Sequence, residues 1–250
     1  MAADREMAAG RPLERSIGTL MTIAENIARI RANMAAAARE AGRDPKEFLL
    51  VGASKMNDAA ACREAVAAGI DALGENRVQE MVQKLEQHAY DGAPLHFIGH
   101  LQRNKVKQVV GHVALIQSVG SLELLDEIEK VAAARGLVQD ILLEVNIGRE
   151  AAKSGFAPEK VLPAAEAALE RTHVRVRGLM TIPPADAQRD ANFRYFQEVQ
   201  ALYVDMNQKL FHNELEYLSM GMSGDYEDAI RAGATMVRVG SAIFGARHYN

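Results

Sequence analysis

The chain has 250 residues, a length that fits one α/β barrel or two ordinary domains. Its 29 Lys and Arg against 33 Asp and Glu give a formal net charge of −4, which argues against nucleic acid or an anionic membrane as the main partner. No apolar run approaches the length of a transmembrane helix, and the single cysteine, Cys62, excludes an internal disulfide and indicates a reducing compartment, which we expect to be the cytoplasm.

The N-terminal residues predict a loose polar arm over residues 1–14, followed by a single domain over residues 15–250. The arm contains acidic residues and lacks an apolar core, so it does not resemble a secretory signal or an organelle transit peptide. Apolar residues then recur at three- and four-residue spacing over residues 20–34, which predicts an amphipathic helix. Gly42 and Pro45 are expected to end that helix.

Eight apolar, strand-like runs follow, and a helical pattern comes after each of them. These runs are residues 48–55, 70–76, 95–100, 113–119, 141–147, 174–182, 215–223 and 236–240. Asn104 and Ser121 are candidate caps for the helices after the third and fourth runs. The count predicts an α/β fold, a single (β/α)8 TIM-type barrel with an extra N-terminal helix. The alternative, a doubly wound sheet, usually has fewer strands and would carry a glycine-rich phosphate loop after its first strand, where this sequence has none.

The first of these runs ends in Lys55. A flexible ammonium group at the mouth of an apolar core can lose its proton, and the neutral amine can form a Schiff base with a carbonyl compound. The alternative is a lysine that simply ends a strand and extends into solvent.

Functional groups of such barrels gather at the C-terminal ends of the strands, and phosphate commonly binds after strands seven and eight. The residues at those ends are Lys55, Glu75, Asn76, His100, Asn146, Met180, Ser223, Arg238, Val239, Gly240 and Ser241. Ser223 and Ser241 each stand beside a glycine just before a predicted helix, so they offer hydroxyl and backbone N–H groups to an anion. Plain helix capping is the alternative for both serines.

Arg238 alternates with two valines, so its side chain should point into the barrel, where its charge requires an acceptor. A lysine that reacts with aldehydes, a phosphate cup and an inward arginine together suggest pyridoxal 5'-phosphate (PLP). In this interpretation Lys55 holds the aldehyde, the cup holds the phosphate and Arg238 faces the ring nitrogen.

Several segments, in order over nearly the whole chain from Phe48 onward, resemble the pyridoxal phosphate homeostasis protein family, relatives of the barrel domain of alanine racemase. They are residues 51–55, 74–80, 96–105, 144–155, 178–180, 219–225 and 237–245. The resemblance implies a covalent PLP site formed by Lys55, Asn76, Met180, Ser223, Arg238, Gly240 and Ser241. An arginine at the pyridine nitrogen would discourage its protonation and limit carbanion chemistry. The N-terminal arm and the Met56-Asn57 pair depart from the family pattern without touching these residues.

The resemblance implies a non-catalytic protein that holds PLP for intracellular vitamin B6 homeostasis, as a monomer, with apo forms of PLP-dependent enzymes as transient clients. The alternative is a PLP-dependent amino-acid racemase, which needs an acid/base group on each face of the substrate, whereas Lys55 serves only one. Alanine racemase takes its second group, a tyrosine, from a C-terminal domain and its dimer partner. Here the chain ends at Asn250, so we expect that domain to be absent, and Tyr226 and Tyr249 are weaker substitutes.

Two further hypotheses carry less weight. His96 and His100 are four residues apart, but their strand-like setting and the lack of a third ligand at a suitable spacing disfavour a metal site. Arg103, Lys105 and Lys107 could contact RNA, although in an acidic protein they are more often a solvated face, or a surface that docks clients.

Overall fold

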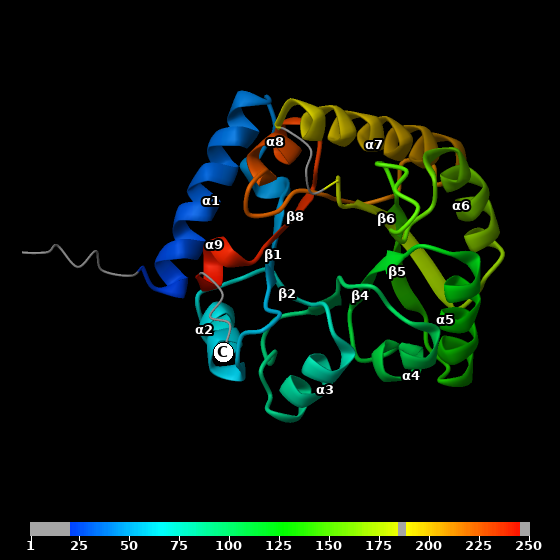
Figure 1. The fold of residues 1–250 in the computed structure, drawn as a ribbon, viewed down its shortest axis with the longest axis horizontal. Coiled ribbons are helices and arrows are strands. Elements are labelled where there is room, and N and C mark those ends of the chain that lie inside the picture. The colour runs from blue at the N-terminus through cyan, green and yellow to red at the C-terminus, as the bar shows by residue number, and fades with distance from the viewer. Residues whose placement is uncertain (1–20, 185–188, 246–250) are drawn as a thin grey trace, which may run out of the picture.

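Eight parallel strands close into a barrel in the computed structural model, which describes residues 21–184 and 189–245 (Figure 1). The strands are β1 (Leu49–Ala53), β2 (Ala72–Glu75), β3 (Leu95–Phe97), β4 (Leu115–Val119), β5 (Gln139–Val145), β6 (Val174–Thr181), β7 (Tyr217–Ser219) and β8 (Met236–Val239). Each strand pairs with the next along the chain, and β8 pairs with β1. This closed order confirms the predicted TIM-type barrel.

Helices follow the strands around the outside of the barrel. The described helices are α1 (Ile23–Glu40), α2 (Ala59–Ala67), α3 (Val78–Glu86), α4 (Val106–Val109), α5 (Leu122–Ala134), α6 (Val161–Leu169), α7 (Arg189–Leu210), α8 (Tyr226–Arg231) and α9 (Ser241–Phe244), with short 3-10 turns η1 (Pro45–Glu47), η2 (Arg103–Lys105) and η3 (Pro158–Lys160). α1 is the predicted extra N-terminal helix. The predicted arm, residues 1–14, lies outside the described residues, and the assignment of residues 15–250 to one domain stays a prediction.

The extra helix α1 covers a side of the barrel that the short helix α9 alone would leave largely uncovered. α9, which follows β8, has only four residues, and α1 packs against α2, α8 and α9 along this side of the barrel (Figure 1). Ile27, Ile30 and Met34 on its predicted apolar stripe are buried, which confirms that stripe, while Leu20 lies outside the described residues. Thr22 caps the helix through a capping box with Glu25.

Two details of the predicted elements differ from the structure. Asn104 is not a helix cap, because the chain enters α4 through the 3-10 turn η2, whose own N-cap is Gln102. Seven of the eight strands are shorter than predicted, most clearly β7, which has three residues within the predicted run 215–223, whereas β5 keeps its predicted length but begins two residues earlier. Beyond β7 the chain turns at Gly221, whose φ of +89° suits glycine. Ser121 does cap α5, accepting a hydrogen bond from the Leu124 N–H at 3.2 Å.

The barrel interior holds an apolar layer with a polar layer nearer the C-terminal ends of the strands. The apolar layer consists of Val51, Ala72, Leu115, Leu142, Met180 and Met236. One step further along the strands, the polar layer includes His96, Gln117, Ser219 and Arg238, all buried. The two layers arise because alternate side chains of each strand face the interior. Within the described residues, every helix falls short of the length or the apolarity that a membrane span requires.

Candidate functional site

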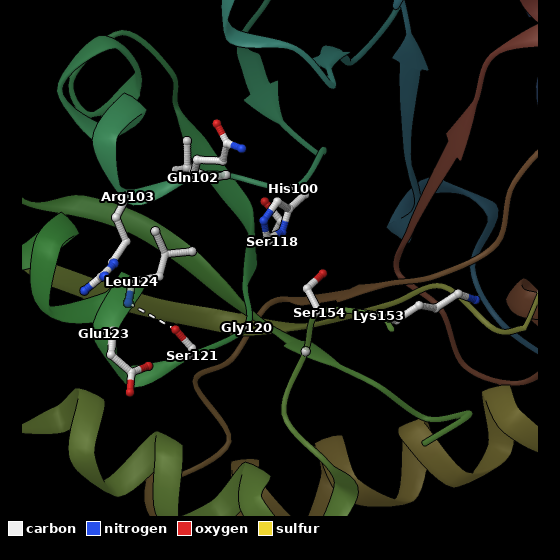
Figure 2. A pocket seen from close by; sticks show the side chains of 12 residues that line it. His100, Gln102, Arg103, Ser118, Gly120, Ser121, Glu123, Leu124, Lys153 and Ser154 are labelled. Atoms are coloured by element: carbon white, nitrogen blue, oxygen red, sulfur yellow. Dashed lines mark hydrogen bonds between the residues drawn. The ribbon is translucent and has the colours of Figure 1, made fainter. Parts of the chain in front are cut away.

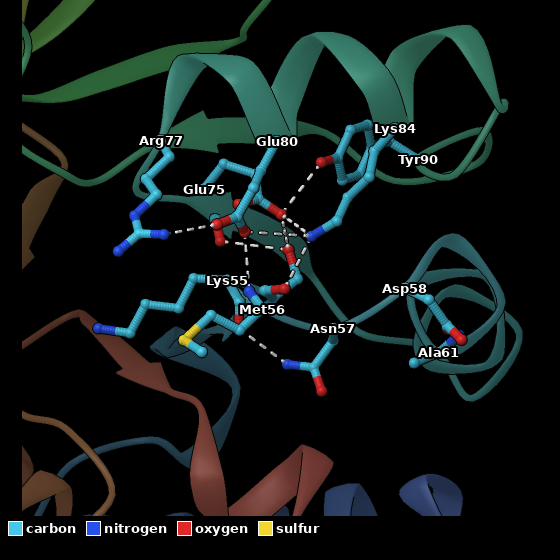
Figure 3. Close-up of polar contacts among 12 residues, drawn as sticks. Lys55, Met56, Asn57, Asp58, Ala61, Glu75, Arg77, Glu80, Lys84 and Tyr90 are labelled. Atoms are coloured by element: carbon cyan, nitrogen blue, oxygen red, sulfur yellow. Dashed lines mark hydrogen bonds and ion pairs between the residues drawn. The ribbon is translucent and has the colours of Figure 1, made fainter. Parts of the chain in front are cut away.

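Lys55 and Arg238 belong to neighbouring strands at the same end of the barrel. β1 and β8 pair with Val51 opposite Arg238, and Lys55 lies two residues beyond the end of β1. The Lys55 side chain is half-buried and extends away from the cluster of Glu75, Lys84 and Tyr90 (Figure 3). Parallel strands therefore bring the lysine and the arginine to the C-terminal end of the barrel, called the mouth below, as the sequence predicts.

Arg238 points into the barrel, which confirms its predicted direction, and only 3% of it is exposed. Its guanidinium donates to the Ser219 hydroxyl at 2.6 Å and to the Thr181 carbonyl at 2.9 Å, so these partners are neutral. Burial lowers the pKa of Arg238 to about 10, and the negative charges of Asp225 and Glu144 act in the opposite direction. The arginine is therefore protonated at neutral pH and lies in the polar layer as a cation.

A chain of hydrogen bonds continues from Arg238 across the barrel. The Ser219 hydroxyl donates to Oε1 of Gln117 at 2.7 Å, and Nε2 of Gln117 lies 3.0 Å from Nδ1 of His96. Burial lowers the pKa of His96 to about 4, so the imidazole is neutral at pH 7 and its Nδ1 can accept from the Gln117 amide. Four side chains from β3, β4, β7 and β8 thus form one buried network that fixes the orientation of the guanidinium.

The predicted phosphate residues come together where the loops after β7 and β8 meet. The Ser223 hydroxyl accepts hydrogen bonds from the N–H groups of Gly240, at 3.3 Å, and Ala242, at 3.4 Å. Ser223 therefore joins the two loops and does not cap its own helix, since the N-cap of α8 is Asp225. Because Ser223 oxygen accepts in both bonds, its O–H group can donate to an anion. Ser241 is exposed beside it.

Gly240 and Asn76 complete the candidate site with features that suit a bound molecule. A Cβ atom on Gly240 would lie 3.3 Å from the Ala53 carbonyl oxygen, so the β8 loop approaches the end of β1 closely. Asn76 follows β2, and its Oδ1 atom is buried with no hydrogen-bond partner among the described residues. An unpaired buried acceptor is unfavourable, so a ligand with an N–H or O–H donor would satisfy it.

Three residues predicted at the mouth lie elsewhere or serve another contact. Met180 is fully buried and belongs to the apolar layer of the barrel interior. Glu75 turns outward, because successive side chains of a strand alternate, and it is bonded to Lys84 between β2 and α3. The Asn146 amide binds both the N–H and the carbonyl of Glu150, so it supports its own loop.

A cavity of about 600 Å³ occupies the other side of the mouth, beyond β3, β4 and β5 (Figure 2). Its lining residues are His100, Leu101, Gln102, Arg103, Ser118, Gly120, Ser121, Glu123, Leu124, Lys153, Ser154 and Gly155. The three serine hydroxyls already have partners in the chain: Ser118 donates to the Gly99 carbonyl, Ser121 caps α5 and Ser154 donates to Glu144. His100 is exposed there, whereas His96 lies inside the barrel.

Three residues of this network are absent from the residues that the sequence predicts at the site: Ser219 and Thr181, the partners of Arg238, and Gln117, which accepts from Ser219. A signal was present, because a polar glutamine within the fully buried strand β4 requires a hydrogen-bond partner. No group of three or more His, Cys, Asp or Glu side chains suited to a metal ion occurs in residues 21–184 and 189–245.

Comparison with known proteins identifies relatives over most of the chain. The family model described as "Alanine racemase, N-terminal domain" matches residues 26–248. The pyridoxal phosphate homeostasis protein of Pseudomonas aeruginosa is 42% identical over 230 residues, covering 92% of this chain and 98% of that protein. The protein of the same name from Aquifex aeolicus is 42% identical over 229 residues, covering 92% of this chain and 100% of that protein.

Solved structures give the same result. PipY of Synechococcus elongatus, in a structure with PLP bound, superposes with a TM-score of 0.78 at 31% identity and covers 90% of this chain and 100% of its own. An alanine racemase of Clostridium difficile has a TM-score of 0.69 at 17% identity over 90% of this chain and 58% of its own, a likeness of fold alone. The chain belongs to the pyridoxal phosphate homeostasis protein family, which shares the fold of the alanine racemase N-terminal domain.

Proposed function

We propose that this protein binds PLP as a Schiff base on Lys55 and acts in intracellular vitamin B6 homeostasis without a robust catalytic activity. The observation that carries the proposal is the meeting of Lys55, the buried cation Arg238 and the Ser223–Gly240 loop contact on the adjacent strands β1, β7 and β8. The PLP-bound structure of PipY, a relative of similar length, supports the choice of ligand.

Each group has a distinct role in this proposal. Lys55 supplies the amine, Ser223, Gly240 and Ser241 bind the phosphate, and Arg238 faces the ring nitrogen. When bound, PLP supplies an electrophilic aldehyde on an electron-withdrawing ring. Arg238 is already protonated at neutral pH, so it would donate a hydrogen bond to the ring nitrogen and would not favour protonation of that nitrogen. An unprotonated ring withdraws electrons weakly, which suits a protein that holds the cofactor.

Asn76, with its unpaired acceptor, and Met180, in the apolar layer, complete the proposed site. Asn76 Oδ1 would accept a hydrogen bond from the ligand, which satisfies its buried oxygen. Met180 would contribute apolar contact from the barrel interior. These residues would therefore orient the ligand. A monomeric state, a cytoplasmic location and PLP-dependent apo-enzymes as clients stay predictions.

Racemisation is the alternative, and the surroundings of Tyr226 argue against one route to it. Its hydroxyl accepts a hydrogen bond from Nδ2 of Asn33 on α1 at 3.0 Å, and the ring is buried between α8 and α1. This position is outside the barrel, so Tyr226 is poorly placed to supply a second acid/base group. Tyr249 lies outside the described residues.

The proposal is tested by the visible absorbance of the purified protein before and after borohydride, compared with the Lys55→Ala variant. We expect a band that borohydride removes in the wild-type protein, a reduced adduct on Lys55 in its peptide map, and neither in the variant. Lys46→Ala is the matched control, because Lys46 is exposed just before β1 and should leave the band unchanged.

A wild-type protein that stays colourless after incubation with PLP and removal of the free cofactor would overturn the proposal. If the wild-type protein does bind PLP, amino-acid racemase assays on the loaded protein distinguish the homeostasis function from racemisation. Racemase turnover that Lys55→Ala abolishes would show that the protein is a racemase. A loaded protein that is inactive on every amino acid tested supports the homeostasis function.

A further inference from the structure

A buried ion pair lies directly behind the chain segment that carries Lys55 (Figure 3). The ammonium group of Lys84, on α3, is 2.6 Å from Oε1 of Glu75, at the end of β2. Their side chains are 8% and 0% exposed. Oε1 also accepts hydrogen bonds from the Tyr90 hydroxyl at 3.1 Å and the Ser54 hydroxyl at 2.6 Å. Removing two charges from water is costly, so a pair buried this deeply calls for a reason beyond stability.

The pair is bonded to the backbone immediately before Lys55. Lys84 Nζ donates to the Ser54 carbonyl oxygen at 2.9 Å, and the Ser54 N–H donates to the Gly74 carbonyl on β2 at 2.9 Å. Hydrophobic side chains in place of Glu75 and Lys84 could fill the same space, but they could not bond this carbonyl. The ion pair therefore holds the end of β1 through directional contacts.

The backbone immediately after Lys55 is held from the same helix. Met56 has a φ of +62°, a left-handed conformation that is unfavourable for a side chain other than glycine. Its N–H group donates to Oε2 of Glu80 at 2.8 Å. Oε2 of Glu80 is also 4.0 Å from Lys84 Nζ, so the two α3 side chains act together. The Asn57 amide, which donates to the Lys55 carbonyl at 3.1 Å, completes the support.

We propose that Glu80, together with Lys84, is a positioning residue for Lys55. Lys84 holds the carbonyl before Lys55 and Glu80 holds the N–H after it, one turn apart on α3. These contacts keep Met56 in its left-handed conformation and direct the Lys55 side chain away from the ion pair, toward the mouth (Figure 3). The inference rests on the proposed function of Lys55, and it identifies the contacts that fix the direction of the Lys55 side chain.

Substitutions of Glu80 test the inference with two independent measurements. Glu80→Ala removes the acceptor of the Met56 N–H, whereas Glu80→Gln retains an oxygen at that position. Glu86→Ala is the control, because Glu86 is exposed at the end of α3 and makes no hydrogen bond or ion pair with the described residues. The measurements are hydrogen exchange of the Met56 amide in protein without PLP, and the rate at which the adduct that borohydride fixes on Lys55 accumulates after PLP is added.

In Glu80→Ala we expect exchange of the Met56 amide to rise about tenfold, and capture of PLP to slow several-fold, because a bond to a charged group is lost. Glu80→Gln should recover most of both effects, and Glu86→Ala should resemble the wild type. Faster exchange with unchanged capture would overturn the positioning role, since the contact would then only stabilise the turn. Unchanged exchange in Glu80→Ala would overturn it at once.

Lys84 is tested in the Glu75→Leu/Lys84→Met double variant, which removes both charges together so that neither is left buried alone. We expect this variant to slow capture as Glu80→Ala does, and capture at the wild-type rate would overturn the role of Lys84. Because the double variant can fail to fold, the Glu80 series decides the proposal. If even the wild type takes up no PLP, the proposed function fails, and acetylation of Lys55 by acetic anhydride replaces capture as the second measurement.

Discussion

Arg238 is a buried cation whose hydrogen-bond partners are the neutral Ser219 hydroxyl and Thr181 carbonyl. The acidic groups Asp225 and Glu144 favour its charged form without forming a close ion pair with it. A charge in this setting depends on its two hydrogen bonds, because very little of the side chain is in contact with water. The arrangement leaves part of the guanidinium available to a ligand, in agreement with the proposed role at the ring nitrogen.

We predict that Ser219→Ala lowers the free energy of unfolding by about 1.5–3 kcal/mol, because it removes an acceptor from a buried charged donor. The measurement is urea denaturation. In an Arg238→Met background the same change should have a much smaller effect, since no guanidinium is then left unpaired. Equal losses in both backgrounds would show that the Ser219 hydroxyl does not act through Arg238.

At the scale of the elements, α1 and α9 divide one position in the ring of helices. α9 has four residues and contributes mainly Ile243 to the buried core, while α1 contributes Ile27, Ile30 and Met34. The Asn26 side chain also donates to the Ile243 carbonyl at 3.0 Å, which ties the two helices together. α9 begins at Ser241, in the proposed phosphate cup, so α1 supports the back of that cup.

We predict that Ile30→Ala lowers the free energy of unfolding by about 2–5 kcal/mol, because it removes a side chain only 1% exposed and leaves a cavity under α1. Ile23→Ala, at the half-buried start of the same helix, should lower it clearly less. Chemical denaturation of both variants checks this expectation. A loss in Ile30→Ala no larger than in Ile23→Ala would mean that α1 is not part of the cooperative core.

At the scale of the whole molecule, the closed barrel excludes water from its interior, so a charged group there is poorly solvated. His96 shows the effect, because burial alone lowers its pKa to about 4. In the unfolded chain the imidazole has an ordinary pKa of about 6.5. Between pH 6.5 and pH 4, roughly, the unfolded chain therefore binds a proton at His96 that the folded protein does not bind. This difference in proton binding has no effect on stability above the unfolded pKa. As pH falls toward the folded pKa, it progressively lowers the free energy of unfolding.

We predict that the wild-type protein loses on the order of 2 kcal/mol more stability than His96→Gln when pH falls from about 7 to about 5. Comparing the two proteins cancels the carboxyl groups that titrate in the same range. Urea denaturation at both pH values gives the difference, and parallel pH profiles would contradict the assignment of a neutral, buried His96. The glutamine retains a side-chain acceptor for Gln117.

Much of this arrangement could be predicted from local patterns. Alternating apolar runs and helical stripes were sufficient for eight strand–helix units, and parallel topology then placed Lys55, Ser223 and Gly240 at one end. Strand ends were less certain, because a shift of one residue exchanges the two faces of a strand. For that reason the sequence predicts Glu75 at the C-terminal end of the barrel, although its side chain lies under α3.

The contacts between distant segments required closure of the barrel. Gln117 and Ser219 meet across 102 positions of sequence, and no local pattern specifies which inward side chains become partners. The same holds for Ser223, which bonds the backbone of Gly240 and does not cap its own helix. Residue spacing encodes the direction of a side chain relative to its own strand, whereas hydrogen-bond partners depend on the stagger between strands, which is set when all eight pack around one core.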